Sequence, residues 1–251
     1  MTEKMLQDKV TLINGASRGI GAAAARLFAR EGATLVLAAR SDMTALVEEL
    51  REHGATVSSV TADLGDVADV RRVVDVVLER HGRLDAAFNN AGMNVPPQGI
   101  AEFSEEDFDR VQRLNHKGVF FAVAAQVRAM RAGGGGAIVN TSSIGALHAN
   151  PMLPAYGTAK RAVNSLTASA AVTYGPDGIR VNAIAPGLTL TDMVRDWEVA
   201  SPGIIEAGTA AIPLGRIARP EEMAEAACWL LSDRASFVSG AVLPVTGGQG
   251  A

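Results

Sequence analysis

The amino-acid sequence predicts an α/β fold in which a mostly parallel sheet is covered by helices on both faces. Short apolar runs alternate with longer amphipathic runs along the whole chain, a pattern typical of parallel strands joined by helical crossovers. A glycine-rich stretch, Asn14 to Gly21, stands between the first apolar run and the first amphipathic run, where α/β folds place a ligand-binding turn. These observations predict a doubly wound, Rossmann-like sheet of seven strands.

The first half of the chain is predicted to contain four strands and four helices. The strands are expected at residues 9–14, 33–39, 56–62 and 84–89, and the helices at residues 19–30, 43–53, 67–81 and about 104–131. Gly32, Gly54 and Gly82 follow the first three helices, at the position where glycine commonly ends a helix. Ser104 precedes three acidic residues, which is typical of a capped helix start.

The second half continues the alternation. Strands are expected at residues 137–142, 179–185 and 241–245, and helices at residues 155–174 and 221–231. Four glycines at residues 133–136 are too few to separate domains, so we expect a single domain over residues 1–251. Pro220 suits the first turn of the last helix. Residues 188–212 show no regular pattern.

Composition excludes several classes of function. The 251 residues are 48% hydrophobic and 20% charged, with a net charge of −4 that gives no general attraction to nucleic acid or anionic membranes. The lone cysteine, Cys228, cannot form an intrachain disulfide, and no Cys/His spacing indicates a metal site. No apolar run is long enough to span a membrane, and the first residues do not form a signal peptide. We therefore expect a cytoplasmic protein whose chemistry depends on side chains or an organic cofactor.

The glycine-rich stretch predicts a dinucleotide site. Gly15, Gly19 and Gly21 follow a G-x-x-x-G-x-G spacing that lets the backbone approach a pyrophosphate at a helix N-terminus. A carboxylate at the end of the second strand would favour NAD(H), but the chain has Ala39 followed by Arg40. Arg40, together with Arg18 in the turn, is suited to a 2′-phosphate, which favours NADP(H) over NAD(H).

A second group of residues indicates proton chemistry. Tyr156 and Lys160 lie four residues apart at a predicted helix start, so they share one face. A nearby ammonium is expected to lower the pKa of a phenol, whose ordinary value is about 10. Ser143 ends the fifth strand, where its hydroxyl is placed to bind a substrate oxygen at the carboxyl edge of the sheet. The residues thus predict a hydride and proton transfer between NADP(H) and a carbonyl/alcohol pair.

The sequence as a whole resembles the short-chain dehydrogenase/reductase family in its compact oxidoreductase form. Within this family it is similar in particular to members of the 3-oxoacyl-ACP reductase type. The resemblance covers nearly the whole chain. It rests on residues 15–21 (GASRGIG), 63–64 (DL), 89–92 (NNAG), 114–118 (LNHKG), 138–143 (IVNTSS), 156–160 (YGTAK), 180–187 (RVNAIAPG), 191–193 (TDM) and 213–216 (PLGR).

The resemblance implies a role for each matching residue. Tyr156 would be the general acid/base, Lys160 would lower its pKa, Ser143 would orient the carbonyl, and Asn115 would anchor a proton-supplying water chain. The residues implied to contact the cofactor are Gly15, Ser17, Arg18, Gly19, Ile20, Gly21, Arg40, Asp63, Leu64, Asn89, Ala91, Gly92, Tyr156, Lys160, Pro186, Gly187, Thr189 and Thr191.

Substrate residues are less constrained by the pattern. Residues 188–212 correspond to a mobile lid in relatives, and candidate substrate contacts are Asn94, His148, Met152 and Trp197. His148 is the only titratable group in residues 144–154, which favours a neutral, partly apolar substrate. Relatives are commonly homotetramers, so a homotetramer or homodimer is expected. Open alternatives are a non-catalytic NADP(H)-binding sensor or scaffold, an NAD-dependent alcohol dehydrogenase, and a longer-branch epimerase or dehydratase, which this chain is too short to match.

Overall fold

The computed structural model describes residues 4–250 and contains the predicted seven-stranded sheet. Its strand order is β3-β2-β1-β4-β5-β6-β7, and every pairing between these strands is parallel. The strands are β1 (Val10–Asn14), β2 (Thr34–Ala39), β3 (Val57–Thr61), β4 (Ala86–Asn89), β5 (Gly136–Thr141), β6 (Ile179–Pro186) and β7 (Val242–Val245). The order reverses direction between β1 and β4, which is the point where doubly wound sheets bind ligands.

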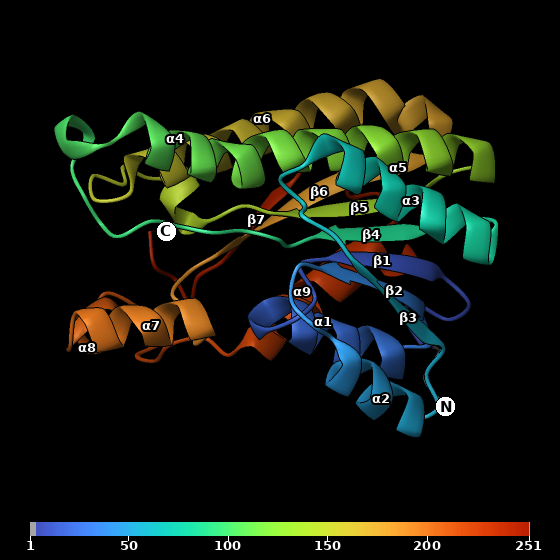
Figure 1. Ribbon diagram of the computed structural model, residues 1–251, viewed down its shortest axis with the longest axis horizontal. Coiled ribbons are helices and arrows are strands. Elements are labelled where there is room, and N and C mark those ends of the chain that lie inside the picture. The colour runs from blue at the N-terminus through green and yellow to red at the C-terminus, as the bar shows by residue number, and fades with distance from the viewer. Residues whose placement is uncertain (1–3, 251) are drawn as a thin grey trace.

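Helices cover both faces of the sheet (Figure 1). One face carries α1 (Gly19–Arg30), α2 (Thr44–Glu52) and α9 (Pro220–Leu231), and the other carries α3 (Val67–His81), α4 (Glu105–Gln112), α5 (Val119–Gly133) and α6 (Pro154–Tyr174). Local signals explain several boundaries. Asp66 and Ser104 accept hydrogen bonds from the first turns of α3 and α4, and Gly82 ends α3 in the left-handed region at φ 71°.

Two apolar layers hold the helices on the sheet. Phe28 of α1 packs against Phe88 of β4, with ring centroids 6.1 Å apart, inside the layer shared with α9. Leu12, Met130 and Ile138 belong to the layer on the opposite face. Because both faces are covered, the central strands are apolar on both sides and show continuous rather than alternating burial.

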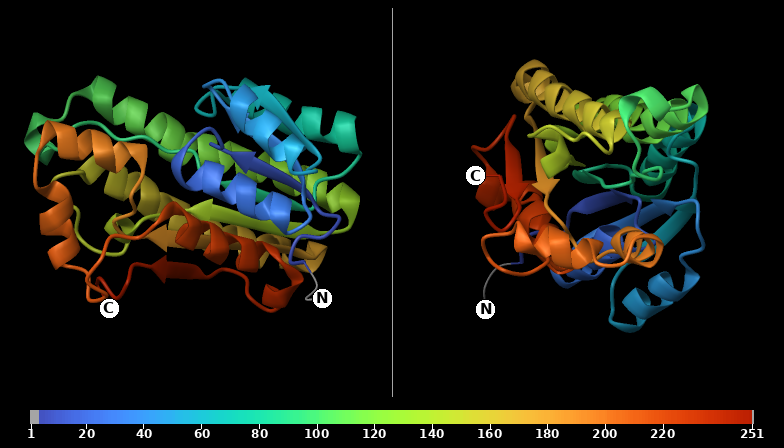
Figure 2. Two further views of the ribbon diagram at one scale, coloured as in Figure 1. Left: turned by 90° about the horizontal axis from the view of Figure 1, so that it is seen from below. Right: turned by 90° about the vertical axis from the view of Figure 1, so that its left-hand side faces the viewer.

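The structure corrects two expectations about the helices. The expected helix at about 104–131 is two α-helices joined by a π-helical segment, Arg113–Gly118, which contains Asn115. Residues 188–212 are not irregular, because they form α7 (Asp192–Ala200) and α8 (Ile204–Ala210). Figure 1 and the left view of Figure 2 place α7 and α8 at one end of the molecule, beyond the carboxyl ends of the strands. Within residues 4–250, no helix combines the length and apolarity needed to cross a membrane.

Candidate active site

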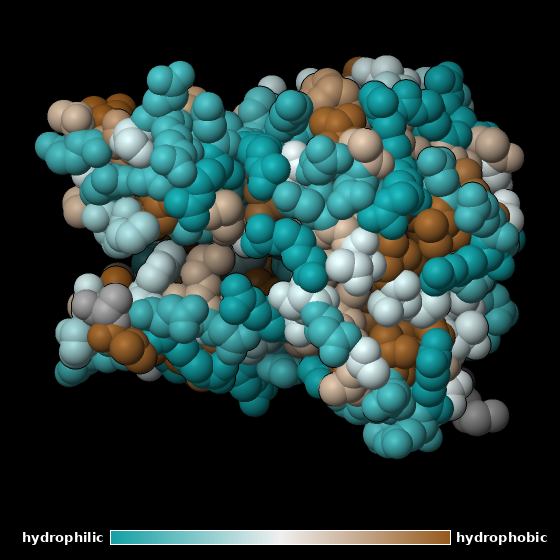
Figure 3. Space-filling model, viewed as in Figure 1, coloured by the Kyte–Doolittle hydropathy of each residue, from teal (hydrophilic) through white to brown (hydrophobic). Residues whose placement is uncertain are grey.

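A cleft of about 900 Å³ opens at the carboxyl edge of the sheet. Figure 3 shows this face of the molecule hollowed between α7–α8 and the layer that carries α4 and α6. The walls of the cleft are formed by the glycine-rich turn, the ends of β2, β4, β5 and β6, the start of α6, the helices α7 and α8, and the residues that follow β7. The cleft therefore collects nearly every loop at this edge.

The glycine-rich turn is shaped for close approach of a ligand. Gly15 has φ +84°, and a Cβ there would lie 2.6 Å from the backbone of Ala91. A Cβ on Gly21 would overlap the carbonyl oxygen of Gly15, which accepts a hydrogen bond from Asn90 Nδ2 at 3.1 Å. Arg18 occupies the N-cap of α1 without a side-chain cap, so the first N–H groups of the helix are available to an anion. These residues fit the pyrophosphate of a dinucleotide.

The two predicted arginines both line the cleft. Arg18 and Arg40 are exposed, and Arg40 directly follows β2, whose last residue is the buried Ala39. No carboxylate ends this strand, so the position that would bind a ribose hydroxyl in an NAD(H) site has no acidic group. Two positive charges are instead available to a phosphate.

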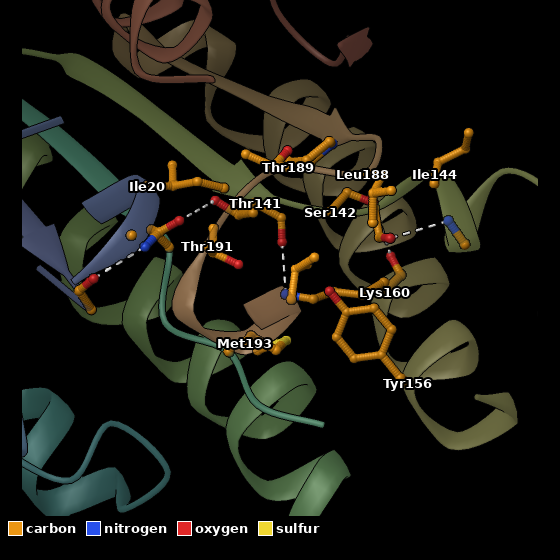
Figure 4. Close-up of a pocket in the computed structure, with 18 of the residues that line it drawn as sticks. Ile20, Thr141, Ser142, Ile144, Tyr156, Lys160, Leu188, Thr189, Thr191 and Met193 are labelled. Atoms are coloured by element: carbon orange, nitrogen blue, oxygen red, sulfur yellow. Dashed lines mark hydrogen bonds between the residues drawn. The ribbon is translucent and has the colours of Figure 1, made fainter. Parts of the chain in front are cut away.

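Tyr156 and Lys160 lie on the first turns of α6, which begins at Pro154. Lys160 is 1% exposed, its Nζ donates to the carbonyl oxygen of Thr141 at 2.9 Å, and this Nζ lies 5.5 Å from the centroid of the Tyr156 ring. Figure 4 shows the two side chains together in the cleft. Ser143 hydrogen-bonds Tyr156, and its Oγ also accepts from the backbone N–H of Gly145 at 3.1 Å. The three predicted side chains are therefore brought together.

The pKa values of this pair differ from the sequence-based expectation. Burial raises the pKa of Tyr156 to about 12, which outweighs the lowering effect of the Ser143 hydrogen bond. Burial also lowers the pKa of Lys160 to about 8. The expected lowering of the Tyr156 pKa by Lys160 is therefore wrong for the protein alone, because desolvation of the phenolate dominates. At neutral pH the pair is a neutral phenol beside an ammonium, which is a proton-donating arrangement.

Asn115 lies directly behind Gly92. Its Nδ2 donates to the carbonyl oxygens of Met93 and Val111 at 2.8 and 2.9 Å, and its Oδ1 accepts from Met93 N at 3.3 Å. A Cβ on Gly92 would lie 3.0 Å from Asn115 Oδ1 and 3.6 Å from Lys160 Nζ. The π-helical segment thus places this carboxamide close to the ammonium, with only a glycine between them.

Most of the other predicted cofactor residues line the cleft. This group comprises Gly15, Ser17, Gly19, Ile20, Leu64, Ala91, Gly92, Pro186, Gly187, Thr189 and Thr191. Gly21 packs against the carbonyl group of Gly15 beneath the turn and does not line the cleft. Thr191 also contacts the turn itself, because its Cγ2 would lie 3.3 Å from a Cβ on Gly19.

Two predicted cofactor residues lie elsewhere. The side chain of Asn89 is buried beneath the cleft, where it hydrogen-bonds Asn14, Gln126 and Asn140. The next residue, Asn90, is the one that lines the wall. Asp63 is ion-paired with Arg113 at 3.0 Å, and its neighbours along the chain rather than Asp63 itself face the cleft.

The predicted substrate residues are divided in the same way. His148 and Trp197 line the cleft, whereas Asn94 and Met152 do not, and Met152 is exposed on the surface. Asn90, within the 89–92 segment that was expected to line the cofactor, lies on the wall, whereas sequence reasoning missed Thr141 and Gln249, which also line it. Within residues 4–250, no group of three or more His, Cys, Asp or Glu side chains is placed to hold a metal ion.

Comparisons with known proteins match the chain over almost its full length. A family model described as enoyl-(acyl carrier protein) reductase matches residues 15–249. An A-factor type γ-butyrolactone 1′-reductase (1S-forming) from Streptomyces virginiae is 46% identical, over 99% of this chain and 98% of that protein.

Solved structures agree with this match. The crystal structure of a levodione reductase superposes with a TM-score of 0.93 at 37% identity, covering 97% of this chain and 98% of that one. The structure of a proposed NAD(P)-dependent gluconate 5-dehydrogenase from Beutenbergia cavernae, which holds NADP at low occupancy, superposes with a TM-score of 0.93 at 33% identity, covering 98% of both chains.

Proposed function

Because the chain belongs to the short-chain dehydrogenase/reductase family, whose matched members are oxidoreductases of alcohols and ketones, we propose that it is an NADP(H)-dependent ketone reductase with Tyr156 as its proton donor. The observation that supports this proposal most directly is the group of Ser143, Tyr156 and Lys160 in one cleft beside a dinucleotide turn. A neutral phenol at physiological pH suits the direction in which a ketone receives a proton.

Each catalytic group has a distinct part in the proposed mechanism. NADPH, when bound, supplies the hydride. Ser143 and Tyr156 donate hydrogen bonds to the substrate carbonyl oxygen, and Tyr156 transfers its proton to that oxygen as negative charge develops. The ammonium of Lys160 stabilises the resulting phenolate from the same buried site. Asn115 holds the backbone next to Lys160 and anchors the route by which the proton is replaced.

The cofactor site is proposed to prefer NADP(H). Arg40 and Arg18 supply positive charge where the adenosine 2′-phosphate would lie, and the Gly15–Gly21 turn holds the pyrophosphate. Pro186, Gly187, Thr189 and Thr191 are proposed to hold the carboxamide end. The NADP reported in the Beutenbergia cavernae relative is in keeping with this preference.

The substrate is proposed to be a neutral ketone with an apolar part. The helices α7 and α8 are proposed to form a lid that closes over it, since Trp197, Ile204 and Gly208 line the cleft from this segment. The 46% identical Streptomyces virginiae relative is named as a reductase of A-factor type γ-butyrolactones, so γ-butyrolactones of this type are the first substrates to test. Diketones are the second, given the levodione reductase structure.

Tyr156→Phe tests the proposed chemistry. The variant should bind NADPH as the wild type does, measured by fluorescence titration, while ketone reduction falls by at least a hundredfold because the proton donor is lost. Retained turnover in Tyr156→Phe would overturn the assignment of Tyr156. Retained NADPH binding without turnover of any ketone or alcohol by the wild type would instead favour a cofactor-binding sensor.

Arg40→Ala tests the cofactor preference. We expect the KM for NADPH to rise about tenfold or more and the KM for NADH to change little, because only NADPH carries the 2′-phosphate. Arg30→Ala removes an exposed arginine at the opposite end of α1 and serves as the matched control. Equal effects of Arg40→Ala on both cofactors would remove Arg40 as the discriminating residue.

A further inference from the structure

Gln249 lines the cleft, and neither the sequence motifs nor the proposed mechanism gives it a role. We propose that its carboxamide oxygen binds a hydroxyl group of the substrate, and that this contact sets which ketones the enzyme prefers. The proposal rests on the function proposed above and names the chemical class of substrate that the same cleft would take.

The turn at residues 246–250 holds Gln249 in a fixed place. Gly187 N donates to Val245 O at 3.0 Å, and Leu214 N donates to Gly247 O at 3.1 Å. A Cβ on Gly250 would overlap the imidazole ring of His148. The turn therefore packs against three segments that frame the cleft: the end of β6, the exit from α8 and the loop after β5. Figures 1 and 2 place the C-terminal end of the chain at the same end of the molecule as α7 and α8.

The carboxamide of Gln249 has an unused acceptor. Gln249 lines the cleft, and its Oε1 is buried without a hydrogen-bond partner among residues 4–250. Leaving such an acceptor unpaired is costly, and most buried polar atoms in folded proteins are paired. In this side-chain conformation the oxygen has almost no accessible surface, but Gln249 forms part of the cleft wall and its terminal torsion turns freely. With the carboxamide turned toward the cleft, a substrate O–H group would pair with this oxygen and remove that cost. A substrate without a donor would leave the oxygen unpaired, so the site discriminates between the two.

The remaining lining residues indicate what else the substrate carries. The loop after β5 contributes Ile144 and Leu153, and the segment from β6 to α8 contributes Leu188, Trp197 and Ile204. These side chains offer apolar surface to a ligand, and the carboxylate that lines the cleft from this segment, that of Asp192, is ion-paired with Arg195 at 3.1 Å. A charged group placed against these apolar side chains would be desolvated without a hydrogen-bond partner, which is unfavourable. The cleft thus fits a neutral ketone that has an apolar arm and a hydroxyl group.

The proposal is tested with a pair of ketones that share one apolar arm and differ only in a hydroxyl group. Gln249→Met keeps the length and unbranched shape of the side chain but removes the acceptor. The wild type should favour the hydroxy ketone by about tenfold in kcat/KM, and in Gln249→Met this ratio should fall to about one. Gln249→Glu keeps acceptor oxygens at the same reach and should retain part of the preference.

The ratio of the kcat/KM values for the two ketones is unaffected by any loss of activity that is the same for both substrates. Gln7→Leu removes an exposed carboxamide before β1, at the opposite edge of the sheet, and should leave the ratio unchanged. An unchanged ratio in Gln249→Met, or equal ratios in Gln249→Met and Gln249→Glu, would overturn the role of Gln249. Calorimetric Kd values for both ketones, measured with NADP⁺ present, separate the two proposals. If the ratio of the two ketones' Kd values depends on Gln249 but neither ketone is turned over, the reductase function alone is refuted. If the ketones are turned over but neither their Kd ratio nor their kcat/KM ratio depends on Gln249, the role of Gln249 alone is refuted.

Discussion

Replacing Lys160 with methionine is expected to stabilise the protein while ending turnover. Burial lowers the pKa of Lys160 from 10.5 to about 8. Keeping this ammonium charged therefore costs about 3 kcal/mol at neutral pH, at about 1.4 kcal/mol per pKa unit. Methionine removes that cost but also the hydrogen bond to Thr141, which contributes about 1 kcal/mol. The net gain of about 2 kcal/mol corresponds to about 4–8 °C in Tm for a chain of this length.

The pH dependence identifies the cause of the gain. Since the folded-state pKa of Lys160 lies below its unfolded-state value, the unfolded chain binds more protons between pH 8 and pH 10.5, and the stability of the wild type rises with pH in that window. The advantage of Lys160→Met should therefore be largest at pH 7 and mostly lost by pH 10. Above pH 10 the raised pKa of Tyr156 lowers stability in both proteins, which sets the upper limit of the comparison.

Thermal unfolding of the protein without cofactor, at pH 7 and pH 9.5, measures both effects. Lys117→Met removes an exposed lysine from the π-helical segment and should change stability by less than about 0.5 kcal/mol at either pH. A Lys160→Met variant that is less stable than the wild type at pH 7, or an advantage that does not shrink with pH, would refute the assignment of a strained, desolvated ammonium.

Two further predictions concern the same region. The rate of alcohol oxidation should rise about tenfold per pH unit over the neutral to alkaline range, because Tyr156 must be deprotonated to accept a proton and its pKa is raised to about 12. The rate of ketone reduction should stay nearly constant below pH 8. Initial rates measured in both directions test this, and parallel pH profiles would contradict it. Gln126→Leu should lower stability by about 2 kcal/mol, seen as a lower Tm, because it breaks the reciprocal amide pair with Asn89 and leaves buried groups unpaired; an unchanged Tm would show that the pair contributes nothing net.

The sequence predicts the fold closely because its signals are local. Apolar runs, helix caps and left-handed glycines such as Gly82 determine boundaries within a few residues. The proposed lid is different: α7 and α8 have nine and seven residues, too short for intrinsic helix preference to decide their structure. Contacts between the two helices help to decide it, since the carboxylate of Glu198 in α7 accepts hydrogen bonds from Gly203 N and Ile205 N at the start of α8.

The site was predicted less completely because neighbouring residues with the same side chain have different surroundings. Asn89 is the last residue of β4 and Asn90 directly follows it, and successive side chains along an extended chain point in opposite directions. Only the packed structure shows that Asn89 faces Gln126 and that Asn90 faces the cleft. The pairing of Asp63 with Arg113, fifty residues apart in the chain, is equally invisible to motif reasoning.

The buried amide network and the cleft together explain how this scaffold separates chemistry from selectivity. Asn89, Asn140 and Gln126 satisfy one another beneath the cleft, with Thr167 of α6 accepting from Asn140 Nδ2 at 3.0 Å. The polar groups of the strand ends are thus used to fix β4, β5 and α6, which position Tyr156 and Lys160. Gln249 also lines the cleft, but it comes from a turn that takes no part in this network. Changing that turn should therefore alter substrate choice without disturbing the proton donor.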